Sequence, residues 1–177
     1  MHTIPIEDNY EISEDEFKKK RKNSKVKGNS FERKVCKILN EHFQTQEFCR
    51  SPGSGAFANT HKLPEQFKIY GDLLTPKNFK YSIEIKKGYS DISVSDIFDK
   101  KSKLWMFVRQ SKSDANSGKR KWMVIWQQDR KKILCICDRE DFPNVNEKDR
   151  LNFSDFSIIL LDLVLYQVPK TEFFSLL

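Results

Sequence analysis

The chain has 177 residues, which is the length of one domain with tails and too short for two ordinary domains. Its hydrophobic fraction is 38% and it contains 14 Phe and 3 Trp, so the composition excludes wholesale disorder. Lys and Arg together number 32 against 25 Asp and Glu, which gives a net charge of +7. That excess favours a polyanionic partner, either nucleic acid or an anionic membrane surface.

The apolar segments argue against a membrane protein. The longest, residues 157–168, is interrupted by Asp162 and is shorter than the roughly 20 residues that a bilayer span needs. Residues 1–16 contain six acids and no Lys or Arg, which is the wrong charge for a secretory or organellar leader. We therefore expect a cytoplasmic protein that does not bind membranes.

The four cysteines contain no CxxC pair, and no Cys/His spacing typical of zinc occurs. Cys135 and Cys137 are two positions apart, so in a strand their thiols share one face. We expect Cys36, Cys49, Cys135 and Cys137 to be buried and reduced.

Charge divides the N-terminal region into an acidic part and a basic part. Residues 17–27, which follow the acidic segment, carry seven Lys or Arg. Such runs are most often solvated, although this one could contact phosphates or act as a localisation signal, with the acidic part masking it. We predict a flexible tail over residues 1–27.

From Gly28 onward the pattern is that of a folded α/β domain. A first helix is predicted by the 3.6-residue spacing of Phe31, Val35, Ile38, Leu39 and Phe43. A short strand and a loop rich in Gly, Ser and Pro follow. The segments IYGDLLT and FKYSIEIKKG then predict a hairpin that turns at residues 76–78.

A second helix is predicted after Ser93 or Ser95, ending before Gly118. KWMVIW and KILCIC predict two more strands, and FSDFSIILLDLVLYQV favours a helix with a strand as the alternative. The resulting order predicts an α/β fold in which a central mixed β-sheet is flanked by helices on both sides.

The residues with the clearest chemistry lie in the predicted hairpin. Alternation in a strand places Glu84 and Lys86 on one face and Ile83 and Ile85 on the other, and the hairpin can bring Asp72 beside Glu84. Two carboxylates with the carbonyl of Ile85 form an oxygen site suited to Mg²⁺. The lysine can then orient or deprotonate the attacking water. The alternative is an exposed strand face without catalytic function.

The motifs KGNSFERKV, CRSPGSGAF, GDLL and SIEIKKG occur in this order over about residues 28–138. They resemble the PD-(D/E)xK nuclease superfamily, especially archaeal Holliday-junction resolvases and their phage-encoded relatives. The resemblance implies a restriction-endonuclease-like core over residues 28–142 and metal-dependent cleavage of DNA, with Mn²⁺ able to replace Mg²⁺. It also implies a branched substrate, a homodimer and a bacterial or phage-infected host cell. Gly71 stands where the superfamily name has Pro, and the loop between Gly55 and Asp72 is longer than in the compact archaeal enzymes.

The resemblance assigns further roles to residues that also have plain structural explanations. Glu32 on the first helix is implied to help position the metal or its waters, although Asn29-x-x-Glu32 also matches a helix-capping box. Arg50, Ser51 and Ser54 are implied to contact the scissile strand, although Gly, Ser and Pro punctuate any loop. Gln110 is implied to hydrogen-bond Lys86 or a phosphate, or else it is a surface glutamine.

A cluster of basic residues near the end of the second helix can follow a DNA backbone, or can belong to a solvated loop. Its members are Arg109, Lys112, Lys119, Arg120 and Lys121. Trp105, Trp122 and Trp126 fall within apolar patterns, so we place them in the core rather than against bases. The glycine-rich loop lacks the GxxxxGK[ST] pattern of a nucleotide-binding loop, so no nucleotide cofactor is expected.

Residues 143–177 are predicted to form a C-terminal extension that packs on the core or forms a dimer interface. Its apolar residues are more numerous than one helical face can bury, which favours the dimer. Three functions stay open at this point: a Holliday-junction resolvase-like nuclease, a homing, restriction-like or nicking endonuclease with the same active site, and a non-catalytic DNA-binding module.

Overall fold

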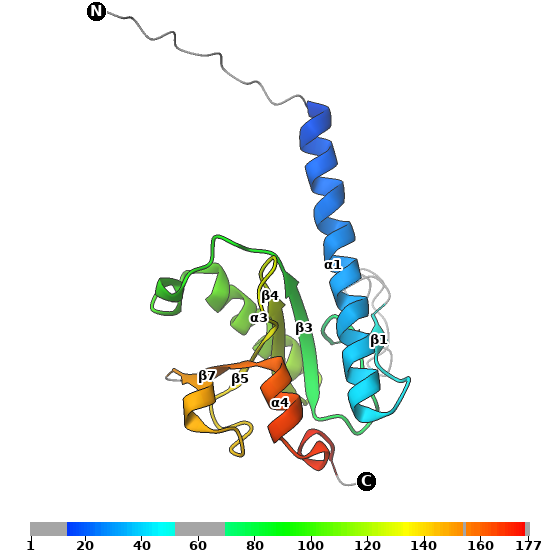
Figure 1. Cartoon of the computed structure of the whole chain (residues 1–177), viewed down its shortest axis with the longest axis vertical. Coiled ribbons are helices and arrows are strands. Elements are labelled where there is room, and N and C mark those ends of the chain that lie inside the picture. Colours follow the sequence, from blue (N-terminus) through cyan, green and yellow to red (C-terminus); the bar gives the residue numbers. More distant parts are fainter. Residues whose placement is uncertain (1–13, 52–69, 154, 176–177) are drawn as a thin grey trace, which may run out of the picture.

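The computed structural model describes residues 14–51, 70–153 and 155–175 (Figure 1). Its helices, 3-10 turns and strands follow in chain order: α1 Glu14–Phe43, β1 Cys49–Arg50, β2 Leu73–Leu74, β3 Tyr81–Lys87, η2 Val94–Ile97, α3 Lys103–Ser117, β4 Lys121–Gln127, β5 Leu134–Asp138, η3 Glu147–Asp149, β6 Arg150–Asn152, β7 Phe156–Leu160, α4 Leu161–Gln167 and η4 Lys170–Phe173. Over these ranges, no helix has the length and apolarity needed to span a bilayer.

Five strands form one mixed sheet in the order β3-β4-β5-β7-β6. β3 and β4 run parallel, and all other neighbours in this sheet are antiparallel. A second, two-stranded sheet pairs β1 with β2. The predicted α/β class with a mixed sheet is therefore confirmed.

Helices cover both faces of the five-stranded sheet. Phe31 and Val35 of α1 share a buried cluster with Ile83 of β3 and Leu161 of α4, while α3 belongs to a separate cluster on the opposite face. That second cluster contains all three tryptophans, Trp105, Trp122 and Trp126, each at most 9% exposed. Their predicted core positions are confirmed.

Helix α1 begins at Glu14, so the prediction of a flexible tail is wrong for residues 14–27. Lys, Arg and Glu are good helix formers, and the packed half of α1 supplies the nucleus from which the helix continues through Gly28. Figure 1 shows the N-terminal part of α1 extending beyond the sheet. Because Asn29 lies inside the helix, it cannot be an N-cap, which removes the capping-box explanation of Glu32.

Two predicted elements are connected differently in the structure. β2 pairs with β1 and makes no ladder with β3, so the predicted hairpin is wrong as a strand pair. The second helix is interrupted: Ser93 precedes the single turn η2, and Ser102 begins α3 by accepting a hydrogen bond from the backbone N–H of Trp105. The predicted start at Ser93 therefore applies to η2 and not to the long helix.

The C-terminal segment completes the sheet. It forms β6 and β7 and then α4, so both the helix and the strand that its sequence allows are present. Phe156, Ile159, Leu161 and Val164 are each at most 1% exposed inside one chain. Part of the apolar excess that favoured a dimer is therefore buried within one chain, while Leu160, Leu163 and Leu165 are half-buried.

The cysteines follow the prediction except at one position. All four are free thiols; Cys36, Cys135 and Cys137 are buried, but Cys49 is exposed. Cys49 lies on the short strand β1, whose side chain at this position points out of the core, so the prediction of burial is wrong there.

Candidate active site

Strand β3 carries acidic and basic residues on its α3-facing side. Ile83 and Ile85 point into the α1 cluster, so Glu84 and Lys86 point the other way. Glu84 is only 3% exposed, and β3 is an outer strand of the sheet. The site is thus a buried acid at a sheet edge.

Asp72 reaches this edge through a turn that depends on Gly71. Gly71 has φ of +83°, and a Cβ atom there would lie 2.5 Å from the carbonyl oxygen of Ile83. Proline is confined to φ near −65°, so this backbone explains why glycine occupies the position. The backbone N–H of Asp72 donates to the Ile83 carbonyl at 2.8 Å, and its carboxylate Oδ2 accepts from the N–H of Ile85 at 2.7 Å.

These two hydrogen bonds bring together the residues that the sequence predicts as partners. In a strand, the N–H and C=O of one residue point to the same side, so the carbonyl of Ile85 also points toward Asp72 at the free edge of β3. Asp72, Glu84 and the Ile85 carbonyl therefore face one region. The predicted approach of Asp72 to β3 is correct, although single hydrogen bonds replace the expected hairpin ladder.

Burial and like charge raise the pKa of both carboxylic acids. The pKa of Glu84 rises to about 7, first because the group is buried and second because the charge of Asp72 is close, with Lys86 opposing both. Burial also raises the pKa of Asp72, against the hydrogen bond from Ile85 and the charge of Lys86. A cation bound between two such acids would favour their ionised forms.

Lys86 is held between an acid and an amide. Its Nζ donates to Glu84 Oε1 at 2.5 Å and to Gln110 Oε1 on α3 at 3.1 Å. The same ammonium lies 5.4 Å from the ring centroid of Phe107. The predicted contact between Gln110 and Lys86 is present.

Asp114 is an acid of this site that the sequence reasoning missed. It is half-buried on α3, where burial raises its pKa against the charge of Lys86. Its own charge adds to burial in raising the pKa of both Asp72 and Glu84. Asp114 lies four residues after Gln110, so the two share one helix face. That spacing is the sequence signal that points to Asp114.

Across the part of the chain that is described, no three side chains of His, Cys, Asp or Glu gather closely enough to hold a metal ion. The side chains available to a metal here are the pair Asp72 and Glu84, with the Ile85 carbonyl as an oxygen ligand beside them. A buried and a half-buried acid, each with a raised pKa and with no Cys or His beside them, fit a hard divalent cation such as Mg²⁺.

A family model described as "Phage putative PDDEXK endonuclease" matches residues 23–171, which is most of the chain. The chain belongs to this family. No curated protein and no solved structure matches it. The family match extends past the predicted domain end at residue 142 and includes β6, β7 and α4. The mixed sheet with helices on both faces is consistent with the restriction-endonuclease-like core expected of a PDDEXK endonuclease.

Two residues with separate predicted roles in this endonuclease bond to each other. Arg50 Nε donates to Glu32 Oε2 at 2.5 Å, and its terminal nitrogen donates to Asn29 Oδ1 at 2.9 Å. The charge of Glu32 adds to burial in raising the pKa of Asp72, so Glu32 lies near the site, but its carboxylate faces Arg50. Arg50 is correspondingly engaged within the protein.

The remaining loop residues divide between the site and the undescribed segment. Ser51 is buried, and its backbone N–H donates to the carbonyl of Asp72 at 3.0 Å, which fixes β1 beside the acid. Ser54, together with the glycines of the same loop, lies outside the described residues. Because the Ser51 N–H is already engaged, a phosphate contact from Ser51 requires a rearranged side chain.

The predicted basic cluster separates into engaged and exposed cations. Arg109 is exposed and donates to the carbonyl of Lys100 at 2.7 Å, whereas Lys112 pairs with Asp155 at 3.3 Å. Lys121 pairs with Asp141. Lys119 and Arg120 line a hollow of about 540 Å³ at the start of β3 and β4, and Arg120 also donates to Thr75 Oγ1. The cations that line this hollow are Lys77, Lys80, Lys119, Arg120 and Lys121.

Proposed function

We propose that this chain is a divalent-metal-dependent DNA endonuclease that hydrolyses a phosphodiester bond at the edge of β3. The observation that carries the proposal is the convergence of Asp72, Glu84 and Lys86 at one sheet edge of a chain that belongs to a PDDEXK endonuclease family. Asp141 is also buried and paired with a lysine, Lys121, but the site at the β3 edge differs in having a second acid and the free strand edge beside it.

Asp72, Glu84 and the carbonyl of Ile85 would hold the metal, with Mg²⁺ as the expected ion and Mn²⁺ as a substitute. When bound, the ion would supply positive charge to the phosphate and lower the pKa of a coordinated water. The chain's own contribution is to hold the two acids close together, where burial and the charge of Asp72 raise the pKa of Glu84 and a cation would favour its ionised form. This makes the acids a metal site rather than a surface ion pair.

Lys86 is the group that orients or deprotonates the attacking water. Its ammonium is positioned by Glu84 on one side and by Gln110 on the other, so its position is set by two elements, β3 and α3. A fixed proton-transfer group within reach of the reacting water contributes typically about 10²–10⁴-fold to a rate. Gln110 acts here through Lys86 and has a positioning role.

The cations of the hollow at the start of β3 and β4, together with Arg109 and the basic run of α1, bind the DNA backbone. No acid lines the hollow among the residues described, and Thr75, which Arg120 contacts, is three residues from Asp72. Three extended residues span at most about 10 Å, so a phosphate in the hollow would belong to the same stretch of DNA as the cleaved one. These contacts carry affinity and not sequence preference.

The test is cleavage of labelled duplex, nicked, single-stranded and four-way DNA by the intact chain in Mg²⁺, Mn²⁺ or EDTA. We expect cleavage in either metal and none in EDTA, with the four-way substrate included because of the resolvase resemblance. Glu84→Gln and Asp72→Asn should each lower the rate by at least about 10³-fold while DNA binding persists. The matched control is Asp162→Asn, an exposed acid of α4.

The outcomes separate the alternatives. Binding of DNA without cleavage in any metal would leave a DNA-binding module and refute the nuclease. Full activity in Glu84→Gln or Asp72→Asn would remove the proposed site even if the chain cuts DNA.

A further inference from the structure

Tyr89 is an exposed aromatic residue three positions beyond the proposed catalytic lysine. It is 40% exposed and lies in the loop that leaves the end of β3. Its φ is +59°, a left-handed conformation that is uncommon for a residue with a bulky side chain. Such a backbone persists only where surrounding contacts impose it.

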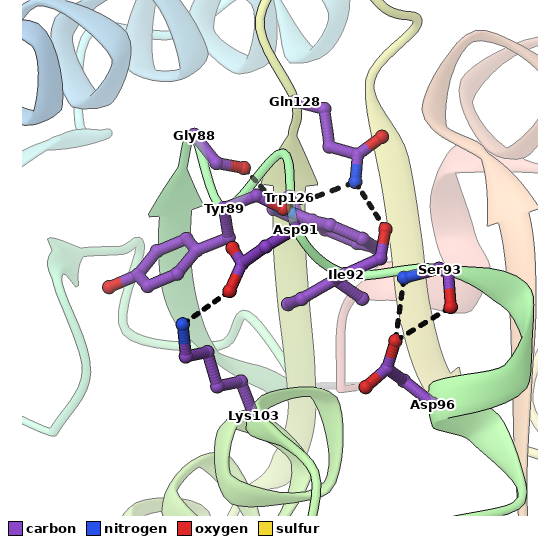
Figure 2. Close-up of polar contacts among 9 residues, drawn as sticks. All are labelled: Gly88, Tyr89, Asp91, Ile92, Ser93, Asp96, Lys103, Trp126 and Gln128. Atoms are coloured by element: carbon purple, nitrogen blue, oxygen red, sulfur yellow. Dashed lines mark hydrogen bonds and ion pairs between the residues drawn. The ribbon is translucent and has the colours of Figure 1, made fainter. Parts of the chain in front are cut away.

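The contacts that impose it come from the end of β4 and just beyond. Gly88 donates its N–H to the carbonyl of Gln127 at 2.9 Å and accepts from the indole N–H of Trp126 at 3.1 Å. The side-chain amide of Gln128 donates to the carbonyls of Tyr89 at 3.1 Å and Ile92 at 2.7 Å. Figure 2 shows the bonds from Trp126 and Gln128 to this loop, which fix the position of the Tyr89 backbone.

The ring of Tyr89 packs against the ring of Phe107, and the ammonium of Lys86 lies beside the same Phe107 ring. The Tyr89 and Phe107 centroids are 4.8 Å apart at 67°, an edge-to-face contact. Lys86 Nζ lies 5.4 Å from the same Phe107 centroid, so the tyrosine ring is separated from the catalytic ammonium by one phenylalanine ring.

The polar end of Tyr89 has no hydrogen-bond partner within the described chain. In Figure 2 its hydroxyl points away from the loop, and no drawn contact reaches it, while the nearby Lys103 is paired with Asp91. A tyrosine that served only to cover Phe107 would gain nothing from this orientation. The exposed part of the Tyr89 side chain is available to a molecule bound at the active site.

We propose that Tyr89 stacks on a nucleobase of the strand being cut, next to the scissile phosphate. The inference rests on the proposed nuclease function, because it needs DNA at the β3 edge, and it deepens that function by naming the substrate class. Leaving its stack to meet a protein ring costs a base its pairing and stacking energy, and this cost is smallest where the strand is already unpaired. The preferred substrate is therefore DNA that is single-stranded or open at a branch point beside the cleaved bond.

The experiment compares binding of a single-stranded oligonucleotide, a four-way junction and a fully paired duplex of the same sequence, in a Glu84→Gln background that prevents cleavage. Tyr89→Asn removes the ring but tolerates positive φ, and Tyr89→Leu keeps an apolar contact with Phe107. Each should weaken binding of the two unpaired substrates about ten- to a hundred-fold and leave the duplex within about two-fold. Tyr89→Phe should bind all three like the parent.

The matched control is Phe98→Leu, an aromatic residue of the same loop region that is 80% exposed, and it should bind every substrate like the parent. In addition, 2-aminopurine placed on either side of the cleaved bond should lose fluorescence on binding to the parent and to Tyr89→Phe, but not to Tyr89→Asn or Tyr89→Leu, since stacking on an aromatic ring quenches this base. Equal loss of affinity for duplex and unpaired DNA, or unchanged quenching in Tyr89→Asn, would overturn the proposal. Cleavage of any DNA by the unsubstituted chain tests the proposed function separately.

Discussion

β3 and β4 are parallel neighbours in full register, yet they differ on the face that meets α3. β4 places Trp122, Val124 and Trp126 there, and each is buried among apolar groups. β3 places Ser82, Glu84 and Lys86 opposite these same three residues. The apolar strand stabilises the fold, whereas the polar one holds charged groups in an environment that disfavours them.

The difference follows from position in the sheet. β4 has a strand on each side, but β3 has β4 on one side only, and Asp72 hydrogen-bonds to its other edge. A buried acid at an edge can still be reached by a metal and a phosphate, which an acid in the middle of the sheet could not. The site therefore occupies an outer strand, where a charge can be both buried and accessible.

The largest expected effect is on the cleavage rate, and it should differ between substitutions of two adjacent lysines of β3. Lys86→Ala should lower the single-turnover cleavage rate about 10²–10⁴-fold, because the proton-transfer group is removed. Lys87→Ala is the matched control, since Lys87 points to the other face, where it lies near Phe31 and pairs with Asp129 at 3.1 Å. It should change the rate by no more than a few-fold.

Measuring the cleavage rate at several pH values tests whether Lys86 acts by proton transfer or only through its charge. Without Lys86 the pKa of Glu84 should rise further, because the neighbouring positive charge is lost. If that were the whole effect, Lys86→Ala would regain the wild-type rate at about pH 9 with excess Mg²⁺. We expect no such recovery, and its occurrence would assign Lys86 an electrostatic role only.

A smaller effect is expected from two glycines with similar backbones. Gly71→Ala meets both a left-handed φ and a Cβ contact of 2.5 Å with the Ile83 carbonyl, whereas Gly88→Ala has φ of +91° and nothing within 4 Å. We expect a loss of unfolding free energy of about 2–4 kcal/mol for Gly71→Ala and about 1–2 kcal/mol for Gly88→Ala. Urea denaturation measures both, and equal losses would show that the close approach to β3 is unimportant.

Much of this site is predictable because it depends on local periodicity. The alternation of SIEIKK places Glu84 and Lys86 on one face of any strand, and the helical spacing of Gln110 places it toward that face. Other features depend on contacts between distant segments. The pairing of β2 with β1 and the bond between Arg50 and Glu32, eighteen residues apart, are decided by how the folded chain closes on itself.

Two differences from the sequence predictions share a cause, because each prediction treats a segment without its folded neighbours. The basic run of residues 17–27 has the charge of a flexible tail, but helix-forming side chains attached to a packed helix continue it instead. The C-terminal segment has more apolar residues than one helical face can bury, which favours a dimer when the segment is taken alone. Divided between β7 and α4, most of these residues are buried or half-buried within one chain, and the homodimer stays a prediction.

The smallest expected effect is a dependence of the unfolding free energy on pH. It arises from Glu84, whereas its β4 neighbour Val124 has no ionisable group. The folded pKa of Glu84 is about 7, and its ordinary value is 4.5, so between these values the folded protein holds a proton that the unfolded chain releases. The stabilisation from this group is complete below pH 4.5 and is lost as the pH rises through about 7. Glu84→Gln cannot ionise, so its unfolding free energy should exceed that of the wild type by an amount that grows by on the order of 2–3 kcal/mol from about pH 5 to about pH 8 without metal.

Adding Mg²⁺ at about pH 8 should stabilise only the wild type, because the ion binds the ionised pair. Glu41→Gln, on the exposed side of α1, is the control and should follow the wild-type curve. Parallel curves for Glu84→Gln and wild type would mean that Glu84 is ionised at no cost, and the contrast between β3 and β4 would lose its electrostatic basis.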